Sequence, residues 1–372
     1  MIPSELKIAS ISDIHLGNLR VPVEEIIDKL DTAFASGSDL KRLDIVFIAG
    51  DVFDRLLSLN ERAAIECRIW VARFLRRCKT HDVIVRVLEG TPSHDWGQSD
   101  LFVSVNKIAK IECDVKYHNE LTVEHIERFG IDVLYVPDEW EFDTDETWRQ
   151  VTELLKKNNI SKVDFAIMHG AFEYQFPAHL TLPVHKEENY LSIVRYYIFI
   201  GHVHRHLPKG RIIPNGSFDR LSHGEEENKG HVRAIIRKDG NHDVLFIPNE
   251  KAKRFDTVDC TGLTLDQATQ RLNERCSDLP DDSYIRVVSN GDDPIIGAVN
   301  AFQEQWPNLN WSCKQNKSQI QRAQTLDDLR AKFKGVEISK DNLPALLLER
   351  LKQRSLDAHV ENRCLQLLEE TL

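Results

Sequence analysis

The chain has 372 residues, of which 41% are hydrophobic and 29% are charged, and its formal net charge at pH 7 is −11. This composition is typical of a globular protein and excludes a fibrous or low-complexity chain. No apolar run reaches the roughly 20 residues that a membrane-spanning helix needs. The acidic balance argues mildly against a protein that binds DNA by bulk charge, although a local basic groove can coexist with it.

The length is too great for one ordinary core, so we expect one large domain with one or two smaller ones. The first residues, MIPSE, lack the basic and apolar regions of a signal peptide. Seven cysteines are scattered without a CxxC pair. We therefore expect reduced, mostly buried thiols in a cytoplasmic protein.

Strand-like and helix-like patterns alternate through the first 90 residues. Buried strands are predicted at 6–12, 43–49 and 83–88, and helices at 26–34 and 61–77. This alternation implies a mainly parallel, twisted sheet. In such sheets ligand-binding groups gather at the carboxyl ends of the strands.

Shorter strands follow. They are predicted at 133–136, 163–168, 197–200, 232–237 and 244–247. The last two are joined by Lys-Asp-Gly-Asn, which is typical of a hairpin turn. The change from alternation to a meander predicts a layered α/β sandwich with two sheets.

A domain boundary is predicted near 249–254, which divides the chain into parts 1–249, 250–325 and 326–372. The second part has strands at 255–258 and 284–289 and helices at 265–276 and 296–305, which indicates a compact α+β module. Residues 314–324 are polar and are interpreted as a linker. Leucines at helical spacing then predict two short amphipathic helices within 337–372.

Five short motifs occur in order, each at or just after a strand-like run. They are Asp13-Ile14-His15, Gly50-Asp51, Ser93-His94-Asp95, His169-Gly170 and Gly201-His202-Val203-His204. Together they supply aspartates and histidines but no cysteine, which is the ligand set of oxygen- and nitrogen-preferring divalent cations. Two cations about 3.5–4 Å apart are a common device for cleaving phosphate esters.

Each motif taken alone has an ordinary structural explanation. Asp-x-His and Gly-Asp also start turns, and a lone His169 would more often be a core histidine than a ligand. The Gly-His-x-His motif is more specific, because it places two imidazoles on one strand edge. Only the ordered set of five indicates a metal centre.

Two other features are interpreted as structural. A second Gly-Asn-His-Asp occurs at 240–243, but it lies after Gly-His-x-His in a predicted hairpin turn, so we exclude it from the site. A basic group, which could form a local DNA-binding groove, is interpreted as the solvated face of a helix. It comprises Arg68, Arg73, Arg76, Arg77 and Lys79.

The motif order resembles the calcineurin-like metallophosphoesterase superfamily, and within it the SbcD-type recombination and repair nucleases, which have archaeal, eukaryotic and phage-encoded members. Asp51-Val52-Phe53-Asp54 is similar to the bacterial SbcD form of the second motif. The segment 215–222 (NGSFDRLS), followed by Glu225 and Lys229-Gly230, resembles the stretch after Gly-His-x-His in those nucleases. The resemblance covers about residues 6–247.

The resemblance implies an α/β/β/α sandwich with a small α+β capping domain and C-terminal helices. The implied domains are a nuclease domain at 1–249, a DNA-positioning capping domain at 250–325, and a linker with an ATPase-binding helical region at 326–372. In this family Asp13, His15 and His204 would hold one metal. Ser93, His169 and His202 would hold the other, Asp51 would bridge them, and His94 would be the general acid, with Asp95 either orienting it or stabilising a turn.

Two departures from the family pattern stand out. The third motif usually reads Gly-Asn-His-Asp, and here Ser93 stands at the position of the metal-ligating Asn. A hydroxyl is a shorter and weaker donor, which would bind the metal directly or through a water. In addition, Asp54 occupies a position where archaeal and eukaryotic members carry a histidine. The role of that histidine therefore does not carry over to this chain.

The resemblance further implies two divalent cations, Mn²⁺ with Mg²⁺ as the alternative. It implies 3′→5′ exonuclease activity on duplex DNA and endonuclease activity on single strands, in the cytoplasm, or in the host cytoplasm if the chain is phage-encoded. The expected partners are DNA, an SbcC-like ATPase docked on the C-terminal helices and a second copy of the chain, but no membrane. The alternatives are a small-molecule metallophosphoesterase and a DNA-tethering scaffold with weak cleavage.

Overall fold

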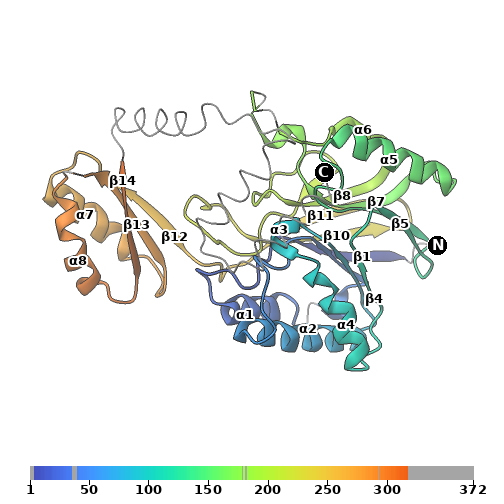
Figure 1. Ribbon diagram of the computed structural model, residues 1–372, viewed down its shortest axis with the longest axis horizontal. Coiled ribbons are helices and arrows are strands. Elements are labelled where there is room, and N and C mark those ends of the chain that lie inside the picture. Colours follow the sequence, from blue (N-terminus) through green and yellow to red (C-terminus); the bar gives the residue numbers. More distant parts are fainter. Residues whose placement is uncertain (1–3, 36–39, 178, 181, 292, 317–372) are drawn as a thin grey trace, which may run out of the picture.

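The computed structural model describes residues 4–35, 40–177, 179–180, 182–291 and 293–316. These residues form three sheets, two of which stack in one body while the third belongs to a smaller module at its side (Figure 1). No helix in the described part of the chain is both long and apolar enough to cross a membrane.

The first sheet has the strand order β11-β10-β1-β2-β3-β4. Its strands β1 to β4 are parallel to one another, and the β10–β11 hairpin joins β1 antiparallel. The bounds are β1 Glu5–Ile11, β2 Ile45–Ala49, β3 Ile84–Leu88, β4 Val115–His118, β10 Gly230–Arg237 and β11 His242–Pro248. Its outer face is covered by helices α1 Val23–Ala33, α2 Arg62–Thr80 and α4 Leu101–Ile108 (Figure 1).

The second sheet has the order β5-β6-β7-β8-β9, with β6 to β9 parallel and β5 antiparallel to β6. Its strands are β5 Thr122–Ile126, β6 Ile131–Val136, β7 Val163–Gly170, β8 Val194–His202 and β9 Ile212–Pro214. Helices α5 Thr144–Lys157 and α6 Glu187–Ile193 pack on its outer side. The four layers confirm the predicted α/β/β/α sandwich.

The central strands are apolar throughout because both of their faces are covered. All five residues of β2 and of β3 and all eight of β7 are buried. Phe47 of the first sheet meets Phe165 and Phe199 of the second, with ring centroids 6.4 Å apart in each pair. This inter-sheet core brings the carboxyl ends of the two sets of strands to one edge of the sandwich.

A buried ion pair also joins the two sheets. Arg86 of β3 is 2% exposed, and its Nε and Nη2 donate to Glu124 of β5 at 2.8 and 2.9 Å. Lys116, Tyr135 and His118 contact the same carboxylate. Burial by itself would raise the pKa of Glu124, but hydrogen bonds from His118, Arg86 and Lys116 hold that pKa well below its ordinary value.

The smaller module has three parallel strands in the order β12-β13-β14, joined by helices α7 and α8. Its elements are β12 Phe255–Asp259, α7 Leu265–Cys276, β13 Tyr284–Asn290, α8 Ile295–Gln305 and β14 Asn310–Asn316. Tyr284 connects it to the large body, since its hydroxyl donates to the Arg20 carbonyl at 2.6 Å. Its ring stacks on Phe255 of β12, and both rings pack against the core under the helical layer of the large body.

One boundary prediction is wrong. We expected a linker over 314–324, but residues 314–316 belong to β14, because pairing in register with β13 outweighs their polar composition. The predicted domain limits 250–325 and 326–372 extend past the described residues and stay predictions. The predicted helices within 337–372 lie outside the described residues.

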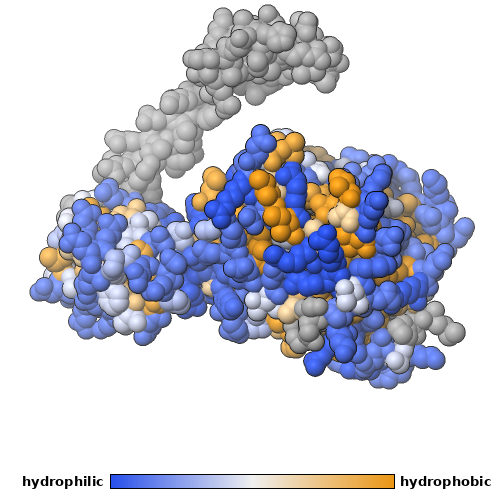
Figure 2. All heavy atoms as spheres, turned by 90° about the horizontal axis from the view of Figure 1, so that it is seen from below, coloured by the Kyte–Doolittle hydropathy of each residue, from blue (hydrophilic) through white to orange (hydrophobic). Residues whose placement is uncertain are grey.

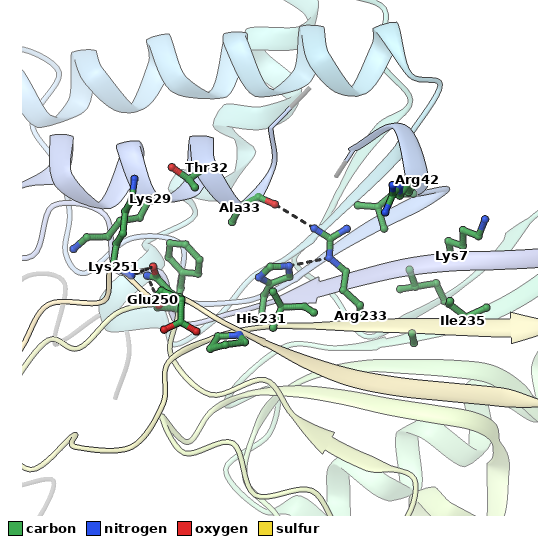
Figure 3. A pocket seen from close by; sticks show the side chains of 17 residues that line it. Lys7, Lys29, Thr32, Ala33, Arg42, His231, Arg233, Ile235, Glu250 and Lys251 are labelled. Carbon is green, nitrogen blue, oxygen red and sulfur yellow. Dashed lines mark hydrogen bonds between the residues drawn. The ribbon is translucent and has the colours of Figure 1, made fainter. Parts of the chain in front are cut away.

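A cavity of about 490 Å³ lies between α1 and the β10–β11 hairpin, and Arg42, Lys7 and Arg233 lie around it (Figure 3). Arg233 donates to Nε2 of His231 and to the carbonyl of Ala33. Burial lowers the pKa of His231 to about 3, so its neutral imidazole accepts the first of these bonds at pH 7. No residue lining this cavity belongs to a cluster of metal-ligating side chains in the described part of the chain.

Replacing Glu124 should destabilise the fold, because Arg86 would remain buried with only the half-exposed Asp114 as its anionic partner. We expect Glu124→Gln to lower the free energy of unfolding at pH 7 by about 1.5–3 kcal/mol. The depressed pKa means that the stabilisation is present above the ordinary value of 4.5 and declines as pH falls below it. Urea denaturation from pH 7 to pH 3 should therefore show the difference from wild type shrinking with acid.

The matched control is Glu153→Gln, which breaks an exposed pair with Arg149. It should change the free energy of unfolding by less than about 1 kcal/mol. A similar loss in the two variants would contradict a special role for the inter-sheet pair.

Candidate metal centre

The five predicted motifs converge at the edge where the two sheets meet. Asp13 and His15 follow β1, Asp51 follows β2, and His94 lies in the short helix α3 (Pro92–Asp95) after β3. From the second sheet, His169 lies near the end of β7 and His202 ends β8, with His204 two residues beyond. Both sheets thus present the carboxyl ends of their strands to one site, as expected for a parallel sheet.

The backbone at this site is held in an uncommon conformation. Asp13, His15 and Asp51 have φ values of 50°, 54° and 50°, and His202 has a φ of 93°. Positive φ costs free energy in residues with a Cβ and persists only where surrounding contacts enforce it. Here the Asp13 amide donates to the Gly50 carbonyl at 3.1 Å, and the Ile14 amide to the Asp51 carbonyl at 2.8 Å, so the two turns hold each other.

Asp13, His15 and His204 form the first cluster, in which one ligand atom from each lies within 4.8 Å of the others. The Nε2 atoms of His15 and His204 are 3.1 Å apart, and His204 Nε2 is 3.8 Å from Asp13 Oδ1. Two imidazole nitrogens aimed at one point beside a buried carboxylate suit a cation between them. The residues predicted for one metal are therefore brought together.

Contacts behind this cluster hold its histidines in place. The Nδ1 of His15 is 3.1 Å from Asp54 Oδ1, and the Nδ1 of His204 is 3.5 Å from Glu225 Oε1. Burial alone would raise the pKa of Glu225, but His204 and Lys229 lower that pKa to about 2. Such outer carboxylates fix the tautomer and raise the basicity of the imidazole as a ligand.

His169, His202 and Asp138 form the second cluster. His169 Nδ1 lies 2.7 Å from the Ala49 carbonyl and donates to it, which directs Nε2 toward the site and Asp51. His202 Nδ1 is 3.2 Å from Asp138 Oδ2. Burial alone would raise the pKa of Asp138, but His202 and His169 lower it to about 2, so the carboxylate is ionised at neutral pH.

Asp51 lies between the two clusters and is 2% exposed. Its Oδ1 is 3.2 Å from His169 Nε2, and its Oδ2 is 3.7 Å from His15 Nε2. Burial would raise the pKa of Asp51, but charge interaction and hydrogen bonding with His169 and His94 hold it far below its ordinary range. This is the arrangement that the predicted bridging role requires.

The structure does not bring Ser93 together with the other predicted ligands, and its role as a metal ligand stays a prediction. Ser93 is exposed, and the hydroxyl among the ligands belongs to Thr91, whose Oγ1 is 3.0 Å from Asp138 Oδ2 and 3.5 Å from His169 Nε2. The physical reason is that Thr91 directly follows the turn after β3, whereas Pro92 starts α3 and carries Ser93 to the surface. The motif contains two extra residues, and counting from Gly90 rather than from His94 would have found Thr91.

His94 and Asp95 have different environments. His94 Nδ1 is 2.8 Å from Asp51 Oδ2, and this hydrogen bond raises the pKa of His94. Asp95 is fully buried, and its two oxygens accept from the backbone amides of Phe53 and Gly90 at 2.9 and 2.8 Å. Burial raises the pKa of Asp95 to about 7. Of the two roles considered for Asp95, the structure favours the stabilisation of turns over the orientation of His94.

The sequence analysis missed Asp138, although the signal was present. Asp138 comes two residues after β6, at the same edge as the other ligands, so its place just after a predicted strand is the signal that indicates it. The excluded motif at 240–243 lies in the β10–β11 hairpin, where His242 contacts the Tyr197 hydroxyl at 2.7 Å. The basic group on α2 is partly neutralised, since Arg73 and Arg77 both pair with Asp31.

Substitutions of Thr91 and Ser93 test directly which hydroxyl contributes to the metal site. We expect Thr91→Val, which keeps the shape but removes the hydroxyl, to weaken Mn²⁺ binding about 10–100-fold. Ser93→Ala should leave the affinity unchanged, because its side chain lies outside the clusters. Calorimetric titration of both variants with Mn²⁺ measures this, and the opposite ranking would restore Ser93 as the ligand.

Comparison with known proteins identifies one family. Residues 6–206 match the family described as calcineurin-like phosphoesterase. One crystal structure at 14% identity covers 65% of this chain and 99% of its own, with a TM-score of 0.37. The match to a crystal structure of TT1561 of Thermus thermophilus, at 10% identity, covers 65% of this chain and 98% of that protein, with a TM-score of 0.36. No curated protein matches. The family match spans more than half of the chain and includes every predicted metal ligand, so the chain belongs to the calcineurin-like phosphoesterase family of metal-dependent hydrolases.

Proposed function

We propose that this protein is a Mn²⁺-dependent DNA nuclease, acting as a 3′→5′ exonuclease on duplex DNA and an endonuclease on single strands. The observation that carries the proposal is that four of the ordered motifs supply two ligand clusters that meet at Asp51, while His94 of the third motif contacts Asp51 itself. The choice of DNA rests on the resemblance of Asp51-Val52-Phe53-Asp54 and of segment 215–222 to SbcD-type nucleases. Its proposed setting is DNA repair or recombination.

The residues present fit two divalent cations. Asp13, His15 and His204 would hold one, Thr91, Asp138, His169 and His202 surround the place of the other, and Asp51 would contact both. Carboxylate, hydroxyl and imidazole donors without thiolate suit Mn²⁺, and Mg²⁺ is the alternative. When bound, such cations polarise a phosphodiester and lower the pKa of the attacking water.

The chain's own residues supply the remaining functions. His94 has a side chain that is 37% exposed, so its ring reaches both the buried Asp51 and the open side of the site. It is the candidate general acid for the leaving 3′-oxygen, because its raised pKa keeps a proton available near neutral pH. Asp95 acts as a positioning residue, since it ties the turn before α3 to the turn after Asp51.

We expect His94→Ala to keep bound Mn²⁺ and DNA affinity but to lose about 10²–10⁴-fold in cleavage rate. Purified wild type and variant are incubated with Mn²⁺ and three substrates: linear duplex DNA, circular single-stranded DNA and p-nitrophenyl phosphate esters. Elemental analysis of the metal content provides the control, and Asp51→Ala should lose the metal. Near-normal turnover by His94→Ala would exclude it as the acid.

The same assay separates the proposal from its two alternatives. A small-molecule phosphoesterase would cleave the p-nitrophenyl esters but neither form of DNA. A DNA-tethering scaffold would bind DNA with little cleavage of any substrate. The partner expected for the C-terminal helices, an SbcC-like ATPase, concerns residues outside the described part and stays a prediction.

We also propose a homodimer formed through the helical layer. Exposed apolar side chains lie on and before α2 and on α4: Leu56, Leu59, Ile65, Ile69 and Ile108, which are 47–81% exposed. The face seen from below, which carries α1, α2 and α4, shows apolar patches among polar residues (Figure 2). Clustered exposed apolar residues of this kind mark association surfaces.

Charges placed on this face should prevent association. We expect the double variant Ile65→Asp/Ile69→Asp to sediment as a monomer at concentrations where wild type sediments as a dimer. Leu245→Asp, at an exposed apolar position on β11, is the control and should not change the mass. A monomeric wild type, or a dimeric double variant, would contradict the proposed interface.

A further inference from the structure

A cavity of about 540 Å³ opens directly beside the second ligand cluster. Asp138 and His202 belong both to that cluster and to the wall of the cavity. Gly170 and Ala171, which follow His169, also line it, together with the loop after β6 and residues 182–184. The cavity therefore lies at the carboxyl ends of β6, β7 and β8, where ligands bind in parallel sheets.

Aromatic and apolar side chains dominate the walls of this cavity. Trp140, Phe142, Phe176 and Leu182 contribute to it. Phe142 is 92% exposed, which is unusual for a side chain of this size. Trp140 is anchored, because its Nε1 donates to Gln150 Oε1 at 2.8 Å. A concave, largely apolar surface with a polar rim is typical of a binding site for a small organic group.

The charge of the lining restricts what that group can be. Asp138, Glu139 and Glu141 contribute carboxylates, and no lysine or arginine occurs among the described residues that line the cavity. A phosphate would be repelled there, whereas a neutral group with N–H donors would find acceptors. The volume lies within the range of about 300–1,000 Å³ that is usual for small-molecule sites.

We propose that this cavity, together with Trp140 and Phe142, binds the unpaired nucleobase next to the scissile phosphate. The inference rests on the proposed function, since it places the phosphate at the metal centre. Nucleobases are neutral, planar and rich in N–H donors, and proteins that bind single strands stack them on aromatic side chains. A base in a duplex must unpair to enter, so the substrate class is a single strand or a frayed end.

The test compares two phosphodiesters that differ in one group. Thymidine 5′-(p-nitrophenyl phosphate) carries a base, whereas methyl p-nitrophenyl phosphate has the same leaving group but neither a base nor a second aromatic ring that could stack. With the full chain and Mn²⁺, Phe142→Ala should lower kcat/KM for the thymidine ester about tenfold or more, as expected for a lost stacking contact. Hydrolysis of methyl p-nitrophenyl phosphate should change less than about twofold, since Phe142 lies outside both ligand clusters.

Two control variants complete the design. Phe142→Tyr keeps the aromatic ring and should retain the wild-type preference, and Leu245→Ala removes an exposed apolar side chain on β11 and should have no effect. Equal losses on both esters, or no loss on either, would overturn the base site while the metal-dependent hydrolysis by wild type still stands. Absence of Mn²⁺-dependent hydrolysis of both esters by wild type would instead overturn the proposed function and the base site with it.

Discussion

The metal centre depends on one contact between the sheets, the hydrogen bond between His169 Nδ1 on β7 and the Ala49 carbonyl at the end of β2. It joins residues that are 120 positions apart and directs Nε2 of His169 toward Asp51. The two sheets can approach this closely because Gly50 and Gly201 flank the contact. A Cβ at either glycine would overlap His169, and one at Gly201 would also overlap the Ala49 carbonyl.

The close approach of the two sheets at this edge strains the backbone, and other contacts in the sandwich offset that strain. Four candidate ligands have positive φ, and the hydrogen bonds between the turns after β1 and β2 offset part of that strain. Asp95 adds a third turn to the set through its bonds to Phe53 and Gly90. At a distance from the site, the Arg86–Glu124 pair fixes the separation of the two sheets. The site is therefore rigid because several independent contacts impose the same geometry.

The site also concentrates buried carboxylates. Asp13, Asp51 and Asp138 lie close together at low exposure, and imidazoles provide the opposing charge. The same negative character extends into the neighbouring cavity through Glu139 and Glu141. The carboxylates would therefore repel an anionic substrate except at the positions where bound cations outweigh their charge. This separation would give the two parts of the site different tasks, one for phosphate and one for a neutral group.

The sequence alone predicted the layered fold, most of its central strands and the candidate ligands Asp13, His15, Asp51, His169, His202 and His204, but not β4, β5, α5 or α6. The strands and ligands could be predicted because strand patterns are local, and because parallel strands must bring their carboxyl ends to one edge. The choice between Thr91 and Ser93 depends on where α3 starts after the turn, and the contacts of Thr91 with Asp138 and His169 became visible only in three dimensions. Asp138 carries a local signal, since it follows a predicted strand, but its contacts with Thr91 and His202 join segments far apart in the chain. The turn contacts of Asp95 and the cavity beside the candidate ligands arise from such long-range contacts as well, which no local pattern of residues encodes.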